Sequence, residues 1–79
     1  MPSAEDVKIY IAQGLICDHI EVVGDDGQHF EAVVVSKAFV GKNIVQQHQM
    51  VYQALGARMK DEIHALSMKT YTPDSWSKK

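Results

Sequence analysis

The sequence predicts an α+β fold in which a three-stranded mixed sheet carries its helices on one face. Two short apolar segments with alternating polar residues are separated by a turn, which is typical of a β-hairpin. The clearest helical pattern of the chain follows, and a third apolar strand comes after it. A helix that connects two neighbouring strands requires them to be parallel, and its crossover is right-handed. The predicted order is therefore α-β-β-α-β-α.

The first predicted helix begins within residues 2–6. Ser3 can cap it, and Asp6 lies three residues later, as in a capping box, at the positive end of the helix dipole. Gly14 weakens the helix near its end. Its apolar residues recur at helical spacing: Val7, Tyr10, Ile11 and Leu15.

A hairpin is predicted next, with strands at residues 17–23 and 29–35. Residues 24–27 form its turn, because glycine and aspartate tolerate positive φ and make short local hydrogen bonds. The second strand has its apolar side chains on one face. These are Phe30, Ala32 and Val34.

Residues 36–43 connect the hairpin to the second helix, which Gly56 breaks or bends. One continuous apolar stripe marks this helix. It consists of Ile44, His48, Val51, Tyr52, Leu55 and Met59. Residues 63–70 form the third predicted strand. Thr72 then caps a short final helix with Pro73 at its first position, where proline is preferred.

Length and composition limit the classes of protein that this chain can represent. Seventy-nine residues suffice for one domain, spanning 1–79, with a modest core. No apolar run is long enough for a membrane span, and no signal-peptide pattern follows Met1, so we expect a cytoplasmic protein. The net charge of −2 excludes a protein that grips nucleic acid by charge alone. We expect the isolated chain to be a monomer or a weak homodimer.

No catalytic motif is present, so the sequence predicts a protein that is not an enzyme. Metalloprotease, phosphate-binding, nucleophile-elbow and paired-cysteine motifs are all missing. Cys17 is the only cysteine, which excludes an internal disulfide. We interpret Cys17 as a half-buried structural thiol in preference to a nucleophile.

The four histidines are the main candidates for chemistry, and spacing alone leaves their roles open. His64 opens the third strand, where a backbone carbonyl can satisfy it or a ligand can reach it. His29 follows the hairpin turn and is either an exposed strand residue or a ligand. His48 lies on an apolar stripe and is expected to be packed, whereas His19 has polar neighbours and is expected to be solvated.

Together, residues 39–42, 47–49 and 61–76 resemble the BolA family, in particular its short bacterial IbaG/YrbA branch. The resemblance covers nearly all of the chain. It implies a BolA-like fold with class II KH-like topology, including an extra helical turn near Arg58. For the IbaG/YrbA branch it also implies a contribution to acid-stress tolerance.

The resemblance further implies an iron-sulfur role. In BolA-like proteins, a histidine that matches His64 is a cluster ligand, and a histidine or cysteine of the hairpin, here His29, is the second. Two imidazoles cannot hold a cluster that needs four ligands, so a partner must supply the others. In the family, a monothiol glutaredoxin and its bound glutathione do so in a heterodimer that shares a [2Fe-2S] cluster. The expected function is an adaptor that delivers this cluster or senses its status.

The alternative function is that of a KH-like transcriptional regulator that binds nucleic acid. KH domains clamp phosphates with a loop that contains two glycines, but this loop has only Gly41, flanked by Lys37 and Lys42. His48 matches the helix histidine of the family, but Gln47 stands where arginine is common. We therefore expect any DNA binding to be weak and strongly salt-dependent.

A purely structural interaction module is the third class. Its docking surface would consist of Phe39, Val40, Tyr71 and Trp76. The preferred interpretation of Trp76 is that it pins the last short helix onto the core.

Overall fold

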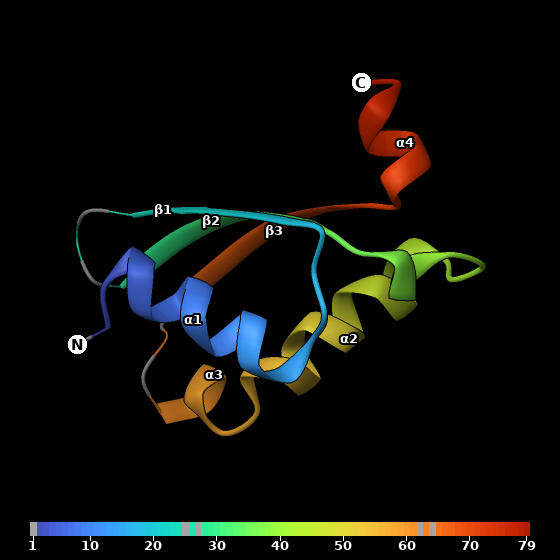
Figure 1. Ribbon diagram of the computed structural model, residues 1–79. Helices are drawn as coiled ribbons and strands as arrows, with labels where there is room; N and C mark the ends of the chain where they lie inside the picture. The colour runs from blue at the N-terminus through green and yellow to red at the C-terminus, as the bar shows by residue number, and fades with distance from the viewer. Residues whose placement is uncertain (1, 25, 27, 62, 64) are drawn as a thin grey trace.

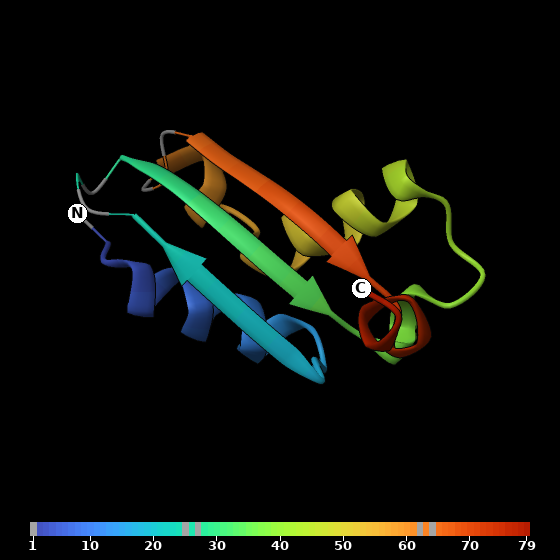
Figure 2. The same ribbon diagram turned by 90° about the horizontal axis from the view of Figure 1, so that it is seen from above.

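Three strands, β1 (His19–Val23), β2 (His29–Val35) and β3 (Ala65–Tyr71), form one sheet in the computed structural model (Figure 1). The model describes every residue except 1, 25, 27, 62 and 64. The strand order is β1-β2-β3, with β1 antiparallel and β3 parallel to β2. Figure 2 shows the three strands side by side, with β2 and β3 running in the same direction. The predicted mixed sheet and its parallel crossover are confirmed.

The helices are α1 (Ala4–Gly14), α2 (Ile44–Leu55), α3 (Arg58–Asp61) and α4 (Pro73–Ser77), with a short 3₁₀ helix η1 (Lys37–Phe39). Figure 1 shows α1, α2 and α3 on one face of the sheet, whereas α4 stands beyond the end of β3 on the other side. The predicted helix order and the extra turn near Arg58 are confirmed, and η1 was not predicted. Among the described residues, no helix is long and apolar enough to cross a bilayer.

Local side-chain hydrogen bonds cap the first turns of α1, α2 and α4. Ser3 and Asp6 form the predicted capping box of α1, and Thr72 caps α4. Asn43 caps α2 in the same way, although its role was not predicted. Gly56 ends α2 with a φ of 59°, a backbone conformation that glycine adopts without a Cβ penalty.

Two strands start later than the sequence pattern indicates. β1 begins at His19, and the carboxylate of the preceding Asp18 accepts from the backbone N–H and from Nζ of Lys37. β3 begins at Ala65 because Ile63 belongs to the preceding turn, where its N–H donates to the carbonyl of Arg58 at 3.0 Å. Part of the predicted 24–27 turn, Asp25 and Gly27, lies outside the described residues.

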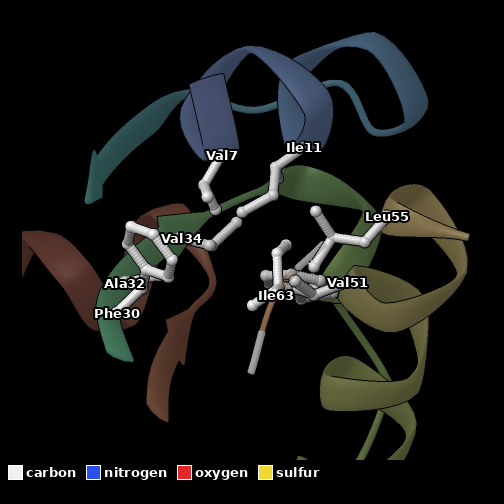
Figure 3. Close-up of a cluster of buried hydrophobic side chains, with 9 residues drawn as sticks. Val7, Ile11, Phe30, Ala32, Val34, Val51, Leu55 and Ile63 are labelled. Atoms are coloured by element: carbon white, nitrogen blue, oxygen red, sulfur yellow. The ribbon is translucent and has the colours of Figure 1, made fainter. Parts of the chain in front are cut away.

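One hydrophobic core lies between the sheet and the helices (Figure 3). It consists of Val7, Ile11, Phe30, Ala32, Val34, Phe39, Val51, Leu55 and Ile63. The predicted inner face of β2 is confirmed, since all three of its side chains are buried. The predicted stripe of α2 is partly wrong, because Ile44 and Tyr52 are 56% and 40% exposed.

Gly14 lies where α1 packs tightly against α2. A Cβ atom added there would lie 2.7 Å from the Cα atom of Ala54. The glycine therefore does more than weaken the end of α1, because it permits the two helices to pack together.

Ser36 is a fully buried polar residue that joins three segments at one end of the sheet. Its hydroxyl donates to the carbonyl of Ile16 at 2.7 Å and accepts from the N–H of Ala38 at 3.1 Å. Its backbone N–H donates to the carbonyl of Tyr71 at 3.0 Å. The Ser36 hydroxyl can be buried without a large energetic cost because it has a hydrogen-bond partner both as donor and as acceptor.

Replacing Ser36 with alanine should therefore lower the free energy of unfolding by about 1–3 kcal/mol, because the two part-buried hydrogen bonds of its hydroxyl, to the carbonyl of Ile16 and from the N–H of Ala38, are lost. Urea titration followed by circular dichroism measures this difference. Ser77→Ala is the matched control, since the exposed Ser77 hydroxyl makes one hydrogen bond within α4. The control should change stability by less than about 0.5 kcal/mol. Equal effects of the two substitutions would contradict the role of Ser36.

Candidate functional site

His29 is the first residue of β2 and lies at the end of the sheet where the hairpin loop meets it. Its side chain is 60% exposed. His64, the other predicted ligand, lies outside the described residues. The next residue along the chain, Ala65, is the Cα partner of His29 in the parallel ladder, and its N–H donates to the carbonyl of Gln28 at 2.9 Å. Strand pairing thus brings the first residue of β3 beside His29.

Asp26 holds the hairpin loop and the imidazole of His29 with one carboxylate. Its Oδ1 accepts from the backbone N–H groups of Gln28 at 2.9 Å and His29 at 2.8 Å. Its Oδ2 lies 2.8 Å from Nδ1 of His29. The backbone N–H of His29, then its ring, then the N–H of Gln28 hold the pKa of Asp26 well below its usual range. The carboxylate is therefore ionised at neutral pH and acts only as an acceptor.

This contact fits a histidine that ligates a metal. A carboxylate can only accept, so Nδ1 of the neutral ring carries the proton and Nε2 carries the lone pair. Metal-ligating histidines commonly donate their other N–H to a carboxylate in this way. Among the described residues there is no group of three or more histidine, cysteine or acidic side chains that could hold a metal.

An open hollow lies beside His29 at the same end of the sheet. Its lining includes Val23, Glu31, Ala65 and Ser67. Val23, Glu31 and Ser67 are neighbours across the three strands, and Ala65 is the neighbour of His29. Side chains of paired residues share a face, so these residues lie on the sheet face opposite the core. A group from another molecule can therefore approach the ring without disturbing the core.

His19 lies at the opposite end of the sheet, where it pairs with Val35. Six residue steps along β2 separate that end from His29, a distance of about 20 Å. The ring of His19 stacks on Trp76 with centroids 5.1 Å apart, and its Nε2 contacts Glu21. The expectation of a solvated His19 is wrong in part, because α4 folds back over it. A sequence pattern does not reveal this contact between distant residues.

Trp76 holds α4 against the sheet, but the predicted contact with the core is wrong. Its ring lies against His19 and also against Tyr71, with centroids 5.1 Å apart in each pair. The surface that it covers is the end of the outer sheet face and not the core. Val35, on that face, is only 1% exposed.

Cys17 lies near the end of the sheet where His19 pairs with Val35. The residue after it, Asp18, donates its backbone N–H to the carbonyl of Val35 at 2.7 Å. Its thiol is half-buried and donates to the carbonyl of Leu15 at 3.3 Å. Burial, and secondarily the charge of Asp18, raises the pKa of Cys17 to about 11. These features favour a structural thiol over a nucleophile or a ligand.

The residues predicted to meet nucleic acid do not form one cationic surface. Lys37 is bound to Asp18, with Nζ at 3.0 Å and its backbone N–H at 3.1 Å. Gly41 and Lys42 are exposed in the loop before α2. His48 is half-buried, and its Nε2 is buried with no hydrogen-bond partner among the described residues. The packed interpretation of His48 agrees with this placement.

Gln47 has a structural role that sequence reasoning missed. It accepts a hydrogen bond from the hydroxyl of Thr70 at 2.6 Å and donates to the carbonyl of Lys42 at 2.9 Å. The amide therefore joins α2 to β3 and to the loop. In the sequence, Gln47 drew attention only because it precedes His48, at a position where the family commonly has arginine.

Known proteins resemble this chain over most of its length. The sequence model of the family described as BolA-like protein matches residues 4–75. Protein BOLA2 of Arabidopsis thaliana is 42% identical over 80 residues, which cover 96% of this chain and 85% of that protein. Acid stress protein IbaG of Escherichia coli (strain K12) is 34% identical, over 92% of this chain and 87% of that protein. The structure of a bolA protein homologue from Coxiella burnetii superimposes with a TM-score of 0.83 at 44% identity, covering 98% of this chain and 99% of that one.

The thiol of Cys17 should react slowly with iodoacetamide at neutral pH. Raising its pKa from 9.0 to about 11 lowers the thiolate fraction roughly 100-fold, and the thiolate is the nucleophile. Mass spectrometry of the alkylated chain measures the rate, and unfolding in urea should restore the rate of an ordinary cysteine. A folded protein that is alkylated as fast as the unfolded one would contradict the structural interpretation.

Proposed function

This chain belongs to the BolA family, and from that premise we propose that it is a non-enzymatic, cytoplasmic adaptor that binds a monothiol glutaredoxin. In this proposal the two proteins share a [2Fe-2S] cluster through His64 and His29. The observation that carries the proposal is the geometry of His29, whose Nδ1 contacts Asp26 as in a ligating histidine. The parallel pairing of His29 with Ala65, next to His64 in the sequence, supports the second ligand.

Ligand counting supports a shared site. A cluster of this type needs four protein or cofactor ligands, and two histidines with two thiolates form the set found in Rieske centres. The partner would supply both thiolates, one from its own cysteine and one from its bound glutathione. The cluster, when bound, supplies the iron and sulfide that the adaptor passes on or senses.

Acid sensitivity follows from the same ligands. A neutral imidazole ligates metal and a protonated one does not, so cluster binding should weaken in acid. This effect would connect cluster handling to acid stress. The relative named acid stress protein IbaG makes the connection relevant to this chain.

Cluster reconstitution with a monothiol glutaredoxin and glutathione tests the two ligands. His64→Ala should abolish the visible absorption and circular dichroism of the mixed complex while leaving the fold intact. His29→Ala should change the spectrum and shorten the lifetime of the cluster more than it weakens binding between the apo proteins, because its ring is a ligand and not a main docking contact.

His19→Ala is the matched control for that experiment, because His19 lies about 20 Å from His29 along the sheet. It should leave the cluster spectrum unchanged. The ligand assignment fails if His64→Ala retains the full spectrum of the mixed complex. The whole proposal fails if the wild-type chain leaves the glutaredoxin homodimer spectrum unaltered and forms no complex in size exclusion.

Nucleic-acid binding is the second and weaker candidate, and the loop before α2 is the observation behind it. Gly41 adopts a φ of 79°, and a Cβ added there would meet nothing within 4 Å, so its backbone is open to a ligand. Lys42 is exposed and makes no ion pair among the described residues. The charge of Lys37, by contrast, is compensated by Asp18.

Because Lys37 is paired with Asp18, only Lys42 of the two loop lysines is uncompensated, so binding should be weak and its salt dependence shallow instead of strong as the sequence suggested. If Lys42 contacts one phosphate, the slope of log K against log salt should be about −1, and Lys42→Ala should remove it. Fluorescence anisotropy with a labelled duplex at several salt concentrations measures the slope. Tight, sequence-selective binding at physiological salt would reverse the ranking of the two candidates.

A further inference from the structure

We propose that Asp26 is a positioning residue that sets the tautomer and the direction of the His29 ring, so that Nε2 is the nitrogen that binds metal. The biological use of this arrangement rests on the proposed function. The tautomer does not, because it is a property of the isolated chain.

Backbone hydrogen bonds fix the orientation of the Asp26 carboxylate independently of the His29 ring. Its Oδ1 accepts two backbone N–H groups, from Gln28 and from His29 itself. Rotation of the carboxylate would break both hydrogen bonds. Oδ2 is therefore directed at Nδ1 of His29, 2.8 Å away.

The acceptor at Nδ1 determines the tautomer of the His29 ring. An ionised carboxylate has no proton to donate, so a neutral imidazole places its proton on Nδ1 and its lone pair on Nε2. Nε2 lies across the ring from Asp26. The hydrogen bond thus determines both which nitrogen can ligate and where that nitrogen points.

The contact contributes little to folding, which separates a positioning role from a structural one. The side chains of Asp26 and His29 are 51% and 60% exposed, and exposed pairs of this kind are worth little stability. The backbone hydrogen bonds to Oδ1 are the structural part of the arrangement. A substitution that keeps Oδ1 and changes only Oδ2 can isolate the effect on the ring.

A second histidine–carboxylate pair in the same sheet has the opposite arrangement. Glu21 contacts Nε2 of His19, not Nδ1. The His19 ring is also held against Trp76. This pair provides a matched control at the far end of the sheet.

Asp26→Asn is the decisive variant. The asparagine oxygen can still accept from the N–H groups of Gln28 and His29, so its amide nitrogen faces the ring. That nitrogen is a donor, and Nδ1 must become the acceptor, which moves the ring proton to Nε2. Glu21→Gln makes the equivalent change at His19.

Long-range ¹H–¹⁵N NMR of the isolated chain at about pH 8 identifies the tautomer, since an ordinary imidazole is neutral there. Wild-type His29 should carry its proton on Nδ1, and Asp26→Asn should shift it to Nε2. Addition of Zn²⁺ should then perturb Nε2 of wild-type His29. Asp26→Asn should lower the Zn²⁺ affinity by about 10–100-fold, and Glu21→Gln should leave it unchanged.

Three results would overturn the inference. They are a wild-type His29 protonated on Nε2, a wild-type Nε2 that Zn²⁺ does not perturb, and an Asp26→Asn chain that binds Zn²⁺ as tightly as the wild type. Failure of the proposed function is distinguishable. If no cluster complex forms with glutaredoxin but Zn²⁺ binding still depends on Asp26, the positioning role stands and the adaptor role falls.

Discussion

The parallel pairing of β2 with β3 is the constraint on which the rest of this structure depends. Two parallel neighbours cannot be joined by a tight turn, so the chain must cross over, and α2 and α3 fill that crossover on the face where α1 also packs. A hydrophobic core between one sheet face and the helices follows from this topology. The same register places Ala65 beside His29, although 36 positions separate them in the sequence.

The sheet has two ends with different chemistry. At one end, buried Ser36 and stacked Trp76 tie together α4, β3 and the segment before β1. Cys17 lies at this end, where burial keeps its thiol protonated. At the other end, exposed His29 and Asp26 lie beside an open hollow on the outer sheet face. The buried contacts around Ser36 and the exposed candidate ligand His29 thus lie at opposite ends of β2.

The sequence by itself determined the features that depend on neighbouring residues. The caps at Ser3 and Thr72 were predicted because their hydrogen bonds close over three residues. The bounds of β2 and its buried face followed from alternation along one strand. His29 was identified as a candidate, but its partner Asp26 was not, even though it is only three positions away, because histidine–carboxylate spacing alone does not show which atoms meet.

Only the tertiary structure decided the contacts between distant segments. Gln47 meets Thr70 across 23 positions of the sequence and His19 meets Trp76 across 57, and no periodicity in the sequence records either contact. The exposure of Ile44 in the apolar stripe of α2 has the same origin. A helical pattern shows which side chains share a face, whereas the position of the sheet decides how much of that face is covered.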